Sequence, residues 1–330
     1  MLTALFFLLA LIAALFAFTA FATARIEARC PAVGEMADAG GGAIHVIERQ
    51  ASSEERGAVL MIHGASGNAA DMSVALAHEL SRLGFRVLSV DRPGHGWSDR
   101  FGCGSPSWPA CQAEAIRRAA EALGVREAVV VAHSLGALAG LAMALDQPDF
   151  VRALVLIAPV SHAWPGGVAG YYTVGAKPVL GAPLRWLVAL PIGLALMGRA
   201  VKSVFAPNLP PADFIEATRL PLVLRPPHFR ANAEDVATAK AAAIALVPRY
   251  PAIRATTEIV TGDMDSVVSA AIHSEGCARD IPGARLTILE GVGHSPHHAA
   301  TPRVVDAILE AERRARQQAE QAAPEARPSL

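Results

Sequence analysis

The chain is predicted to form an α/β fold, in which a mostly parallel, twisted sheet carries helices on both faces. Short β-branched runs alternate with segments of helical spacing, which is typical of repeated strand–helix–strand units. Several of these runs are apolar at every position, as expected for strands that are buried on both faces. Two further features, an apolar N-terminal run and one long break in the alternation, add a transmembrane helix and an inserted helical lid.

The N-terminal run covers residues 2–24, where only threonines interrupt apolar and small residues. As a helix it is long enough to cross a hydrocarbon core of about 30 Å. No Lys or Arg precedes the run, so we expect residues 1–24 to be a retained membrane anchor rather than a cleaved signal sequence. Export after signal cleavage stays open, because Ala-Thr-Ala at 22–24 resembles a cleavage site. Arg25 and Arg29 favour the cytoplasmic side for the following domain.

The core is predicted in two parts, residues 25–159 and residues 255–316. Strands are expected at 43–48, 58–62, 86–90, 129–132, 152–158, 256–261 and 284–290. Helices are expected at 71–83, 112–123, from about 137 to 146, at 268–278 and at 302–316. Residues 317–330, rich in Gln, Glu, Ala and Pro, are expected to form a disordered tail.

Residues 160–254 interrupt the alternation with a stretch rich in Pro, Gly, Ala and Leu and without a convincing strand. A stretch of this length should contain helices of its own, and we interpret it as a lid over the site. Residues 179–197 are apolar enough to suggest a second membrane span. Pro183, Arg185 and Pro191 argue against it, because an isolated arginine at mid-span is costly, so a buried or membrane-facing lid helix is expected instead.

A candidate nucleophile, Ser134, lies where the β-branched run from Val129 ends in His-Ser-Leu-Gly and an Ala-rich helical segment begins. A sharp turn from strand to helix would expose its hydroxyl. The amide of Leu135 would then point toward the place where an oxyanion forms. The structural alternative is a serine that only caps a helix.

Two later residues complete a possible catalytic set in the order Ser134, Asp265, His294. Each follows the predicted carboxyl end of a strand, the edge at which open parallel sheets gather their sites. Asp263 also lies near the end of the same strand. Small residues in the loop at 63–68 would let the amide of Ala65 act as a second oxyanion donor, although an ordinary glycine-rich turn has the same composition.

With these motifs in this order, the chain resembles the α/β-hydrolase superfamily from Ala43 to Arg316. The matching segments are His63-Gly64, Asp91-Arg92-Pro93-Gly94-His95-Gly96, Ala132-His133-Ser134-Leu135-Gly136, Gly262-Asp263-Met264-Asp265 and Gly293-His294. One position departs from the pattern: Ala132 stands where the family usually has glycine, and its methyl group is expected to be tolerated.

The resemblance implies nucleophilic acyl transfer by Ser134, with His294 as the base that accepts its proton. Asp265 would orient the histidine, because the family's acid typically lies three residues after the glycine. The amides of Leu135 and Ala65 would bind the oxyanion.

The expected activity is that of a membrane-anchored serine hydrolase acting on a small apolar carboxylic ester or related acyl compound. The hydrophobic insertion motivates the apolar preference. A cofactor-free haloperoxidase-like or C–C bond hydrolase on the same triad is an alternative. A non-catalytic binding protein on a hydrolase fold is an alternative of another class.

Composition limits the other partners. The net charge is -1 and no basic stripe occurs, so no nucleic acid is expected. Four irregularly spaced cysteines do not form a zinc pattern. His294, His297 and His298 are also irregular for metal ligands, and the triad already needs one of them, so neither a metal nor a cofactor is expected.

Overall fold

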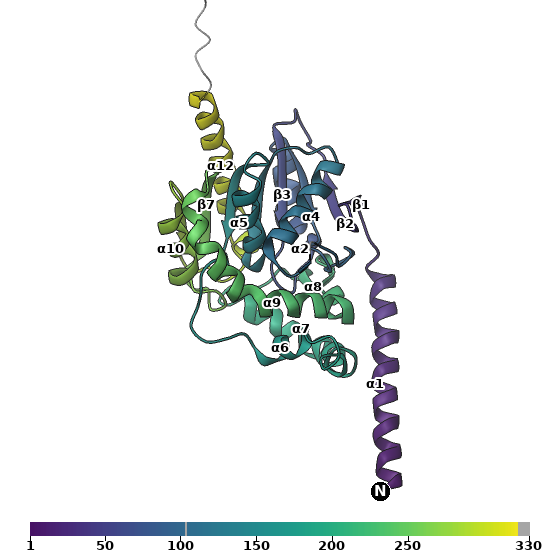
Figure 1. Ribbon diagram of the computed structural model, residues 1–330. Helices are drawn as coiled ribbons and strands as arrows, with labels where there is room; N and C mark the ends of the chain where they lie inside the picture. The colour runs from purple at the N-terminus through teal and green to yellow at the C-terminus, as the bar shows by residue number, and fades with distance from the viewer. Residues whose placement is uncertain (103, 323–330) are drawn as a thin grey trace, which may run out of the picture.

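The computed structural model describes residues 1–102 and 104–322 and has the predicted α/β architecture (Figure 1). In this part of the chain, an 8-stranded sheet has the order β1-β2-β4-β3-β5-β6-β7-β8. The strands are β1 (Glu35–Asp38), β2 (Ala43–Arg49), β3 (Gly57–Ile62), β4 (Phe85–Val90), β5 (Ala128–His133), β6 (Val151–Ile157), β7 (Thr256–Gly262) and β8 (Arg285–Leu289). The β1–β2 and β2–β4 pairs are antiparallel, and the remaining pairs are parallel.

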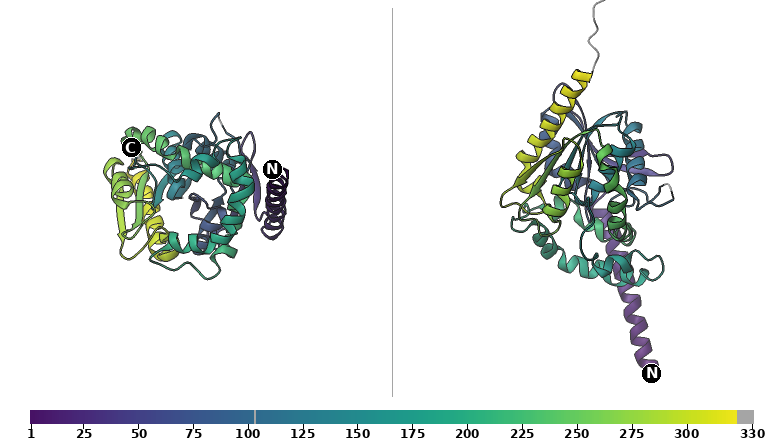
Figure 2. Two further views of the ribbon diagram at one scale, coloured as in Figure 1. Left: turned by 90° about the horizontal axis from the view of Figure 1, so that it is seen from below. Right: turned by 60° about the vertical axis from the view of Figure 1, so that its left-hand side comes forward.

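The helices of the core cover both faces of this sheet (Figures 1 and 2). They are α2 (Ala69–Met72), η1 (Ser73–Ala77), α3 (His78–Arg82), α4 (Pro109–Ala122), η2 (Ser134–Gly136), α5 (Ala137–Asp146), α10 (Ala270–Asp280), α11 (Pro296–Ala299) and α12 (Thr301–Ala322). The chain begins with α1 (Leu2–Arg29).

The central strands are buried on both faces because successive side chains point to opposite sides. In β3, Leu60 and Ile62 pack in one apolar layer with residues of α4 and α5. Val59 and Met61 pack in the opposite layer with residues of α3 and α12. The near-continuous apolar runs that predicted these strands therefore reflect two cores, one on each side of the sheet.

Two elements, strand β1 and helix α12, differ from the sequence expectations. The edge strand β1 was not predicted, because its sequence Glu-Met-Ala-Asp has only Ala37 buried and so carries no clear apolar alternation. The last helix, α12, continues to Ala322, so the predicted tail does not begin at residue 317. Gln, Ala and Glu at 317–322 are good helix formers. Residues 323–330 of the predicted tail lie outside the described residues.

Between β6 and β7, the structure contains helices and no strand. We call residues 160–254 the insertion. Its elements are α6 (Gly170–Gly175), η3 (Leu184–Ala189), α7 (Leu190–Phe205), α8 (Phe214–Ala217), η4 (Leu220–Leu224), α9 (Pro226–Leu246) and η5 (Val247–Ala252). In Figure 1, α6, α7, α8 and α9 lie together at one end of the sheet.

Two helical segments of the described chain are long and apolar enough to cross a membrane, Leu2–Arg29 and Leu184–Phe205. The first, α1, projects away from the domain (Figures 1 and 2). The second comprises η3 and α7. It packs one face, including Leu190 and Val201, into an apolar cluster that also contains Ile26 of α1.

A buried ion pair fastens the insertion to the core. Arg92, in the loop after β4, donates to Asp235 of α9 with an Nη1–Oδ2 distance of 2.6 Å, and both side chains are almost fully buried. The other carboxylate oxygen of Asp235 accepts a bond from Arg100. Removing one partner of such a pair leaves an uncompensated buried charge.

Asp235→Ala is therefore expected to lower the free energy of unfolding by about 3 to 5 kcal/mol. Glu79→Ala is the matched control, because Glu79 forms an exposed pair with Arg82 and should cost only about 0.5 kcal/mol. Denaturant unfolding of the full chain in detergent measures both changes. Equal, small losses in the two variants would contradict the fastening role of the Arg92–Asp235 pair.

Candidate active site

Ser134 lies at a sharp turn between β5 and η2. Its φ of 52° is in the left-handed region, which is costly for a residue with a side chain and is kept only where the surroundings hold it. Two glycines allow the neighbouring loop to come close. A Cβ atom at Gly136 would lie 2.4 Å from the carbonyl oxygen of His63, and one at Gly64 would lie 2.9 Å from Cβ of Ser134.

Ala132, the departure from the family pattern, is accommodated by a glycine on the following helix. Ala132 is fully buried, and its methyl group faces Gly140 of α5. A Cβ atom at Gly140 would lie 3.0 Å from Cβ of Ala132, closer than side-chain atoms pack comfortably. The glycine that permits close packing here therefore lies on helix α5, at Gly140, and not on strand β5.

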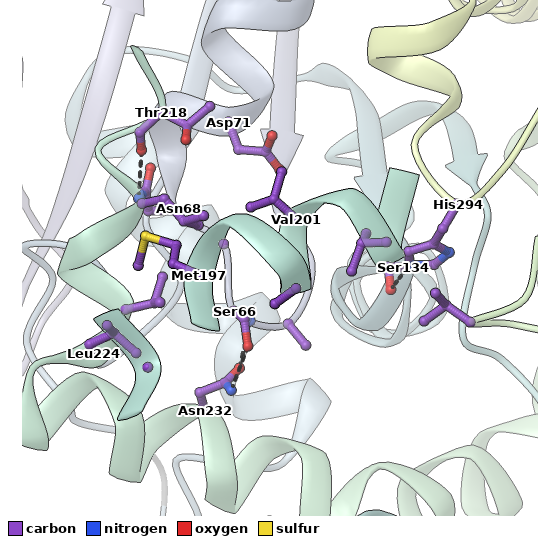
Figure 3. A pocket seen from close by; sticks show the side chains of 18 of the residues that line it. Ser66, Asn68, Asp71, Ser134, Met197, Val201, Thr218, Leu224, Asn232 and His294 are labelled. Carbon is purple, nitrogen blue, oxygen red and sulfur yellow. Dashed lines mark hydrogen bonds between the residues drawn. The ribbon is translucent and has the colours of Figure 1, made fainter. Parts of the chain in front are cut away.

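The three residues proposed from their order in the chain come together at the carboxyl edge of the sheet. His294 Nε2 is 2.9 Å from Ser134 Oγ, and His294 Nδ1 is 2.8 Å from Asp265 Oδ2. Figure 3 shows Ser134 and His294 facing each other across this bond. Side chains in hydrogen-bond contact in this order can transfer a proton from the serine hydroxyl to the imidazole.

The geometry distinguishes the two acids near the end of β7. Asp265 directs one carboxylate oxygen at His294, and its other oxygen accepts bonds from the amides of Val267 (2.8 Å) and Val268 (2.9 Å). Asp263 instead accepts a bond from the amide of Gly291 at 2.8 Å. Of these two acids, Asp265 is the one that contacts His294. Its role as the acid that orients the histidine stays a prediction.

The predicted oxyanion amides belong to loops that meet beside Ser134. Leu135 follows Ser134 in η2, and Ala65 lines the same cavity as Ser134 and His294. The loop that carries Ala65 is tied to the insertion, because the amide of Ser66 donates to Asn232 Oδ1 of α9 at 2.8 Å. The assignment of these two amides as oxyanion donors stays a prediction.

A cavity of about 380 Å³ opens above Ser134. Its walls are mainly apolar side chains of the insertion, which Figure 3 shows from close by. These include Leu196, Met197, Val201, Val204, Phe205, Phe214, Leu220, Val223, Leu224 and Phe229. The lining contains no Arg or Lys among the described residues. Sequence reasoning located the insertion but not these positions, because their contact with the site depends on how four separate elements, α7, α8, η4 and α9, pack together.

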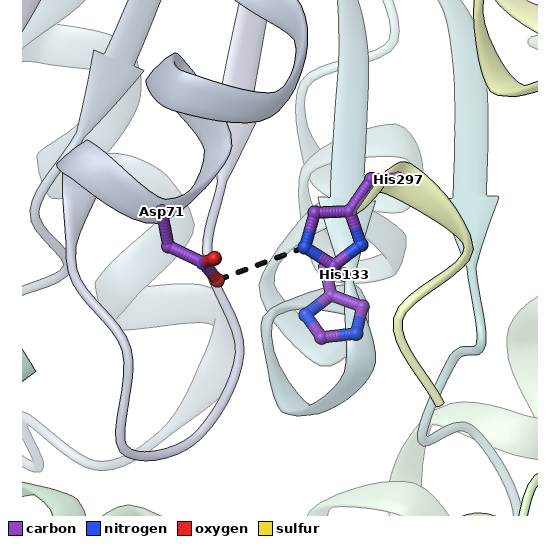
Figure 4. Close-up of side chains that lie close together, drawn as sticks. All are labelled: Asp71, His133 and His297. Carbon is purple, nitrogen blue, oxygen red and sulfur yellow. Dashed lines mark ion pairs between the residues drawn. The ribbon is translucent and has the colours of Figure 1, made fainter. Parts of the chain in front are cut away.

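A second group of polar side chains supports the site and was missed from the sequence (Figure 4). His133, directly before Ser134, hydrogen-bonds through Nε2 to the carbonyl oxygen of His294 at 3.0 Å. Asp71 of α2 accepts a bond from His298 Nε2 at 2.8 Å and lies 3.7 Å from His297 Nε2. Asp71 thus connects the helix after β3 with the segment that follows His294.

Burial determines the charges in this group. It lowers the pKa of His133 and His297, so both imidazoles are neutral near pH 7. Burial alone would raise the pKa of Asp71, but the nearby His297 and the hydrogen bond with His298 hold it well below its usual value. Asp71 is therefore a carboxylate close to two neutral rings, those of His133 and His297.

The same group offers three potential metal-ligand atoms within 4.8 Å of one another, one each from Asp71, His133 and His297. This set differs from the three histidines considered in the sequence. One nitrogen of His133 is already bonded to the His294 carbonyl, and Asp71 is shared with His298. These bonds hold the loop that carries His294.

Comparison with known proteins supports the fold. A family model described as alpha/beta hydrolase fold matches residues 57–190. An uncharacterized protein of Mycobacterium tuberculosis is 26% identical over 263 residues, covering 76% of this chain and 74% of that protein. A 2-hydroxy-6-oxononadienedioate/2-hydroxy-6-oxononatrienedioate hydrolase from Pseudomonas is 25% identical over 256 residues, covering 77% and 86% of the two chains.

Solved structures give the same fold. A thermophilic esterase from Thermogutta terrifontis superposes with a TM-score of 0.64 at 21% identity, covering 86% of this chain and 98% of the other. A 2-hydroxy-6-oxo-6-phenylhexa-2,4-dienoate hydrolase from Rhodococcus has a TM-score of 0.68 at 18% identity, covering 85% and 98%. Together with the sheet order and the family match over residues 57–190, these similarities show that the chain has the α/β-hydrolase fold.

Proposed function

We propose that the protein is a serine hydrolase that cleaves carboxylic esters of apolar compounds through an acyl-enzyme on Ser134. The observation that carries the proposal is the continuous hydrogen-bonded series Asp265–His294–Ser134 at the base of an apolar cavity. Nucleophile, base and orienting acid are each within direct bonding distance, which is the arrangement that activates a serine.

In this mechanism, Ser134 Oγ attacks the ester carbonyl carbon while His294 Nε2 takes the hydroxyl proton. Asp265 holds the imidazole in the required orientation and stabilises its charged form. The amides of Leu135 and Ala65 donate to the oxyanion, where one donor is typically worth about 3 kcal/mol. The C–O bond then breaks, and His294 gives its proton to the departing alcohol. Water, deprotonated by His294, releases the carboxylic acid and regenerates Ser134.

The lining of the cavity supports an uncharged, apolar substrate. Asp71 at its edge is anionic, and the described lining residues include no Arg or Lys that could pair with a substrate carboxylate. C–C bond hydrolysis is the second candidate, because two similar proteins are named as hydrolases of dienoate compounds. Such carboxylate substrates match this cavity less well than a neutral ester does.

The triad assignment predicts a sharp difference between two neighbouring aspartates. Asp265→Asn should lower kcat by about 10⁴-fold, because the histidine loses its orienting carboxylate. Asp263→Asn is the matched control. Its kcat should stay within about twofold of wild type, because the Asp263 carboxylate bonds the Gly291 amide and not His294. Hydrolysis of p-nitrophenyl butyrate measures both.

Labelling with a fluorophosphonate probe tests the nucleophile in the same preparation. Wild type should be labelled and Ser134→Ala should not. Equal labelling of the two proteins, or an equal loss of activity in the two aspartate variants, would contradict the triad.

The apolar cavity predicts a preference for longer acyl chains, because each buried methylene contributes up to about 0.8 kcal/mol. We expect kcat/KM to rise from p-nitrophenyl acetate to butyrate and octanoate, measured below the concentration at which each ester forms micelles. A strong preference for acetate would contradict the apolar-acyl assignment.

We also propose that α1 is retained as a membrane anchor. Its C-terminal half is part of the folded domain, since Thr19, Ala22 and Ile26 are buried and Glu27 pairs with Arg225 of the insertion at 3.0 Å. Cleavage near residue 25 would remove part of this packing. Most of its other apolar side chains are exposed, as expected of a helix that faces lipid.

Fractionation of cells tests the anchor. The full-length protein should stay with membranes in high salt and at alkaline pH and should dissolve only in detergent. Release by salt, or a mature N-terminus near Arg25, would contradict a retained helix. Protease protection in sealed vesicles then reports the side of the membrane. Arg25 and Arg29 favour the cytoplasmic side, whereas the disulfide bond of Cys111 favours an oxidising compartment.

A further inference from the structure

We propose that the insertion is itself embedded in the bilayer beside α1, so that the cavity takes its ester substrate directly from the lipid. This inference rests on the proposed function and on α1 being a retained anchor. It adds the source of the substrate and the surface through which the substrate enters.

The first observation is the position along α1 at which this helix contacts the insertion. Phe16 of α1 stacks on Trp186 of η3, with ring centroids 4.8 Å apart. A membrane span needs about 20 residues. Wherever such a window lies in the apolar run 2–24, Phe16 is about 8 to 12 Å inside its domain-side boundary at the rise of an α-helix. Because Trp186 lies against Phe16, η3 is placed inside the apolar layer as well.

The second observation is the surface of the insertion around η3 and α7. Large apolar side chains are exposed there, among them Val174, Val179, Leu180, Val188, Ile192 and Leu194. Val179 and Leu180 are each 78% exposed. Figures 1 and 2 show that the helices of the insertion lie at the end of the domain from which α1 projects. Exposed apolar surface that is continuous with a membrane-spanning helix is suited to lipid.

The third observation is the charge of this surface. Residues 160–212 contain no Asp or Glu but four basic residues, Lys177, Arg185, Arg199 and Lys202, in a chain whose net charge is -1. Lys177, Arg199 and Lys202 are exposed. A helical surface that combines apolar and cationic residues and lacks anionic ones is typical of proteins that lie in the interface of an anionic bilayer.

Arg185 is the exception, because it is buried. Its guanidinium donates to the carbonyl oxygens of Gly175 (2.8 Å), Lys177 (2.7 Å) and Pro178 (2.7 Å). Backbone carbonyls therefore satisfy this arginine without any carboxylate. A charged group in an apolar layer needs such partners.

The fourth observation is the path from the outer surface to Ser134. On α7, Gly193, Met197 and Val201 line the cavity. Leu196 and Val204 line it too, yet they are 49% and 37% exposed. They form an apolar rim between the outer face and the cavity, so an acyl chain can move from lipid to Ser134 without crossing a polar surface.

Charge insertion on the outer face tests the proposal. The variants are Ile192→Asp and the double variant Val179→Asp/Leu180→Asp, at exposed positions that do not line the cavity. The control is Ile244→Asp, at a position 56% exposed near the C-terminal end of α9. Full-length proteins are reconstituted in vesicles of phosphatidylcholine and phosphatidylglycerol. They are assayed with water-soluble p-nitrophenyl butyrate and with p-nitrophenyl palmitate dissolved in the vesicles.

We expect the activity of the outer-face variants on the embedded ester to fall at least about tenfold, because an aspartate in the apolar layer is costly. Their activity on butyrate and their labelling by fluorophosphonate should stay near wild type. The control should change neither activity. Unchanged hydrolysis of the embedded ester would overturn the inference, whereas absence of labelling in wild type would overturn the proposed function instead.

A depth measurement does not depend on catalysis. Vesicle lipids brominated on the upper acyl chain should quench tryptophan fluorescence of the wild type, and Trp186→Phe should lose a large part of that quenching while keeping an aromatic ring against Phe16. Equal quenching in the two proteins would place Trp186 outside the bilayer and overturn the inference.

Discussion

The sharp turn at Ser134 is the constraint on which the site depends. Ser134 has a left-handed backbone, and the loop after β3 approaches this turn closely, which Gly64 and Gly136 permit. Because β3 and β5 are neighbouring parallel strands, both loops leave the sheet at the same edge. The turn thus brings Ser134, the first turn of the following helix and the loop of Ala65 into one place.

The position of His294 depends on groups outside the triad. Its backbone carbonyl is bonded to His133, and Asp71 holds the segment just after it through His298. The two buried imidazoles, His133 and His297, are neutral because burial lowers their pKa. A carboxylate close to these two neutral rings can help to orient the loop, and neither ring adds a positive charge beside His294.

The insertion has two apolar faces with different surroundings. Its inner face closes the cavity above Ser134, and the buried Arg92–Asp235 pair fixes it to the core. Its outer face carries exposed apolar and cationic side chains at the end from which α1 projects. An amphipathic helix in solution buries one apolar face and exposes a polar one. Apolar residues on both faces of α7 are consistent with a cavity on one side and lipid on the other.

The sequence by itself determined the central strands of the sheet, because strands buried on both faces need uninterrupted apolar runs, and β3, β5 and β6 have them. It also determined the order Ser134, Asp265, His294, which the carboxyl edge of a parallel sheet brings together. Edge strand β1 was not predicted, because its four mostly exposed residues show no apolar periodicity. Three features were decided only by the tertiary structure: the cavity lining, the packing of Ala132 against Gly140, and the hydrogen bonds of Asp71 and His133 that support the site. Each depends on contacts between separate elements, and no local sequence pattern encodes how those elements are placed relative to one another.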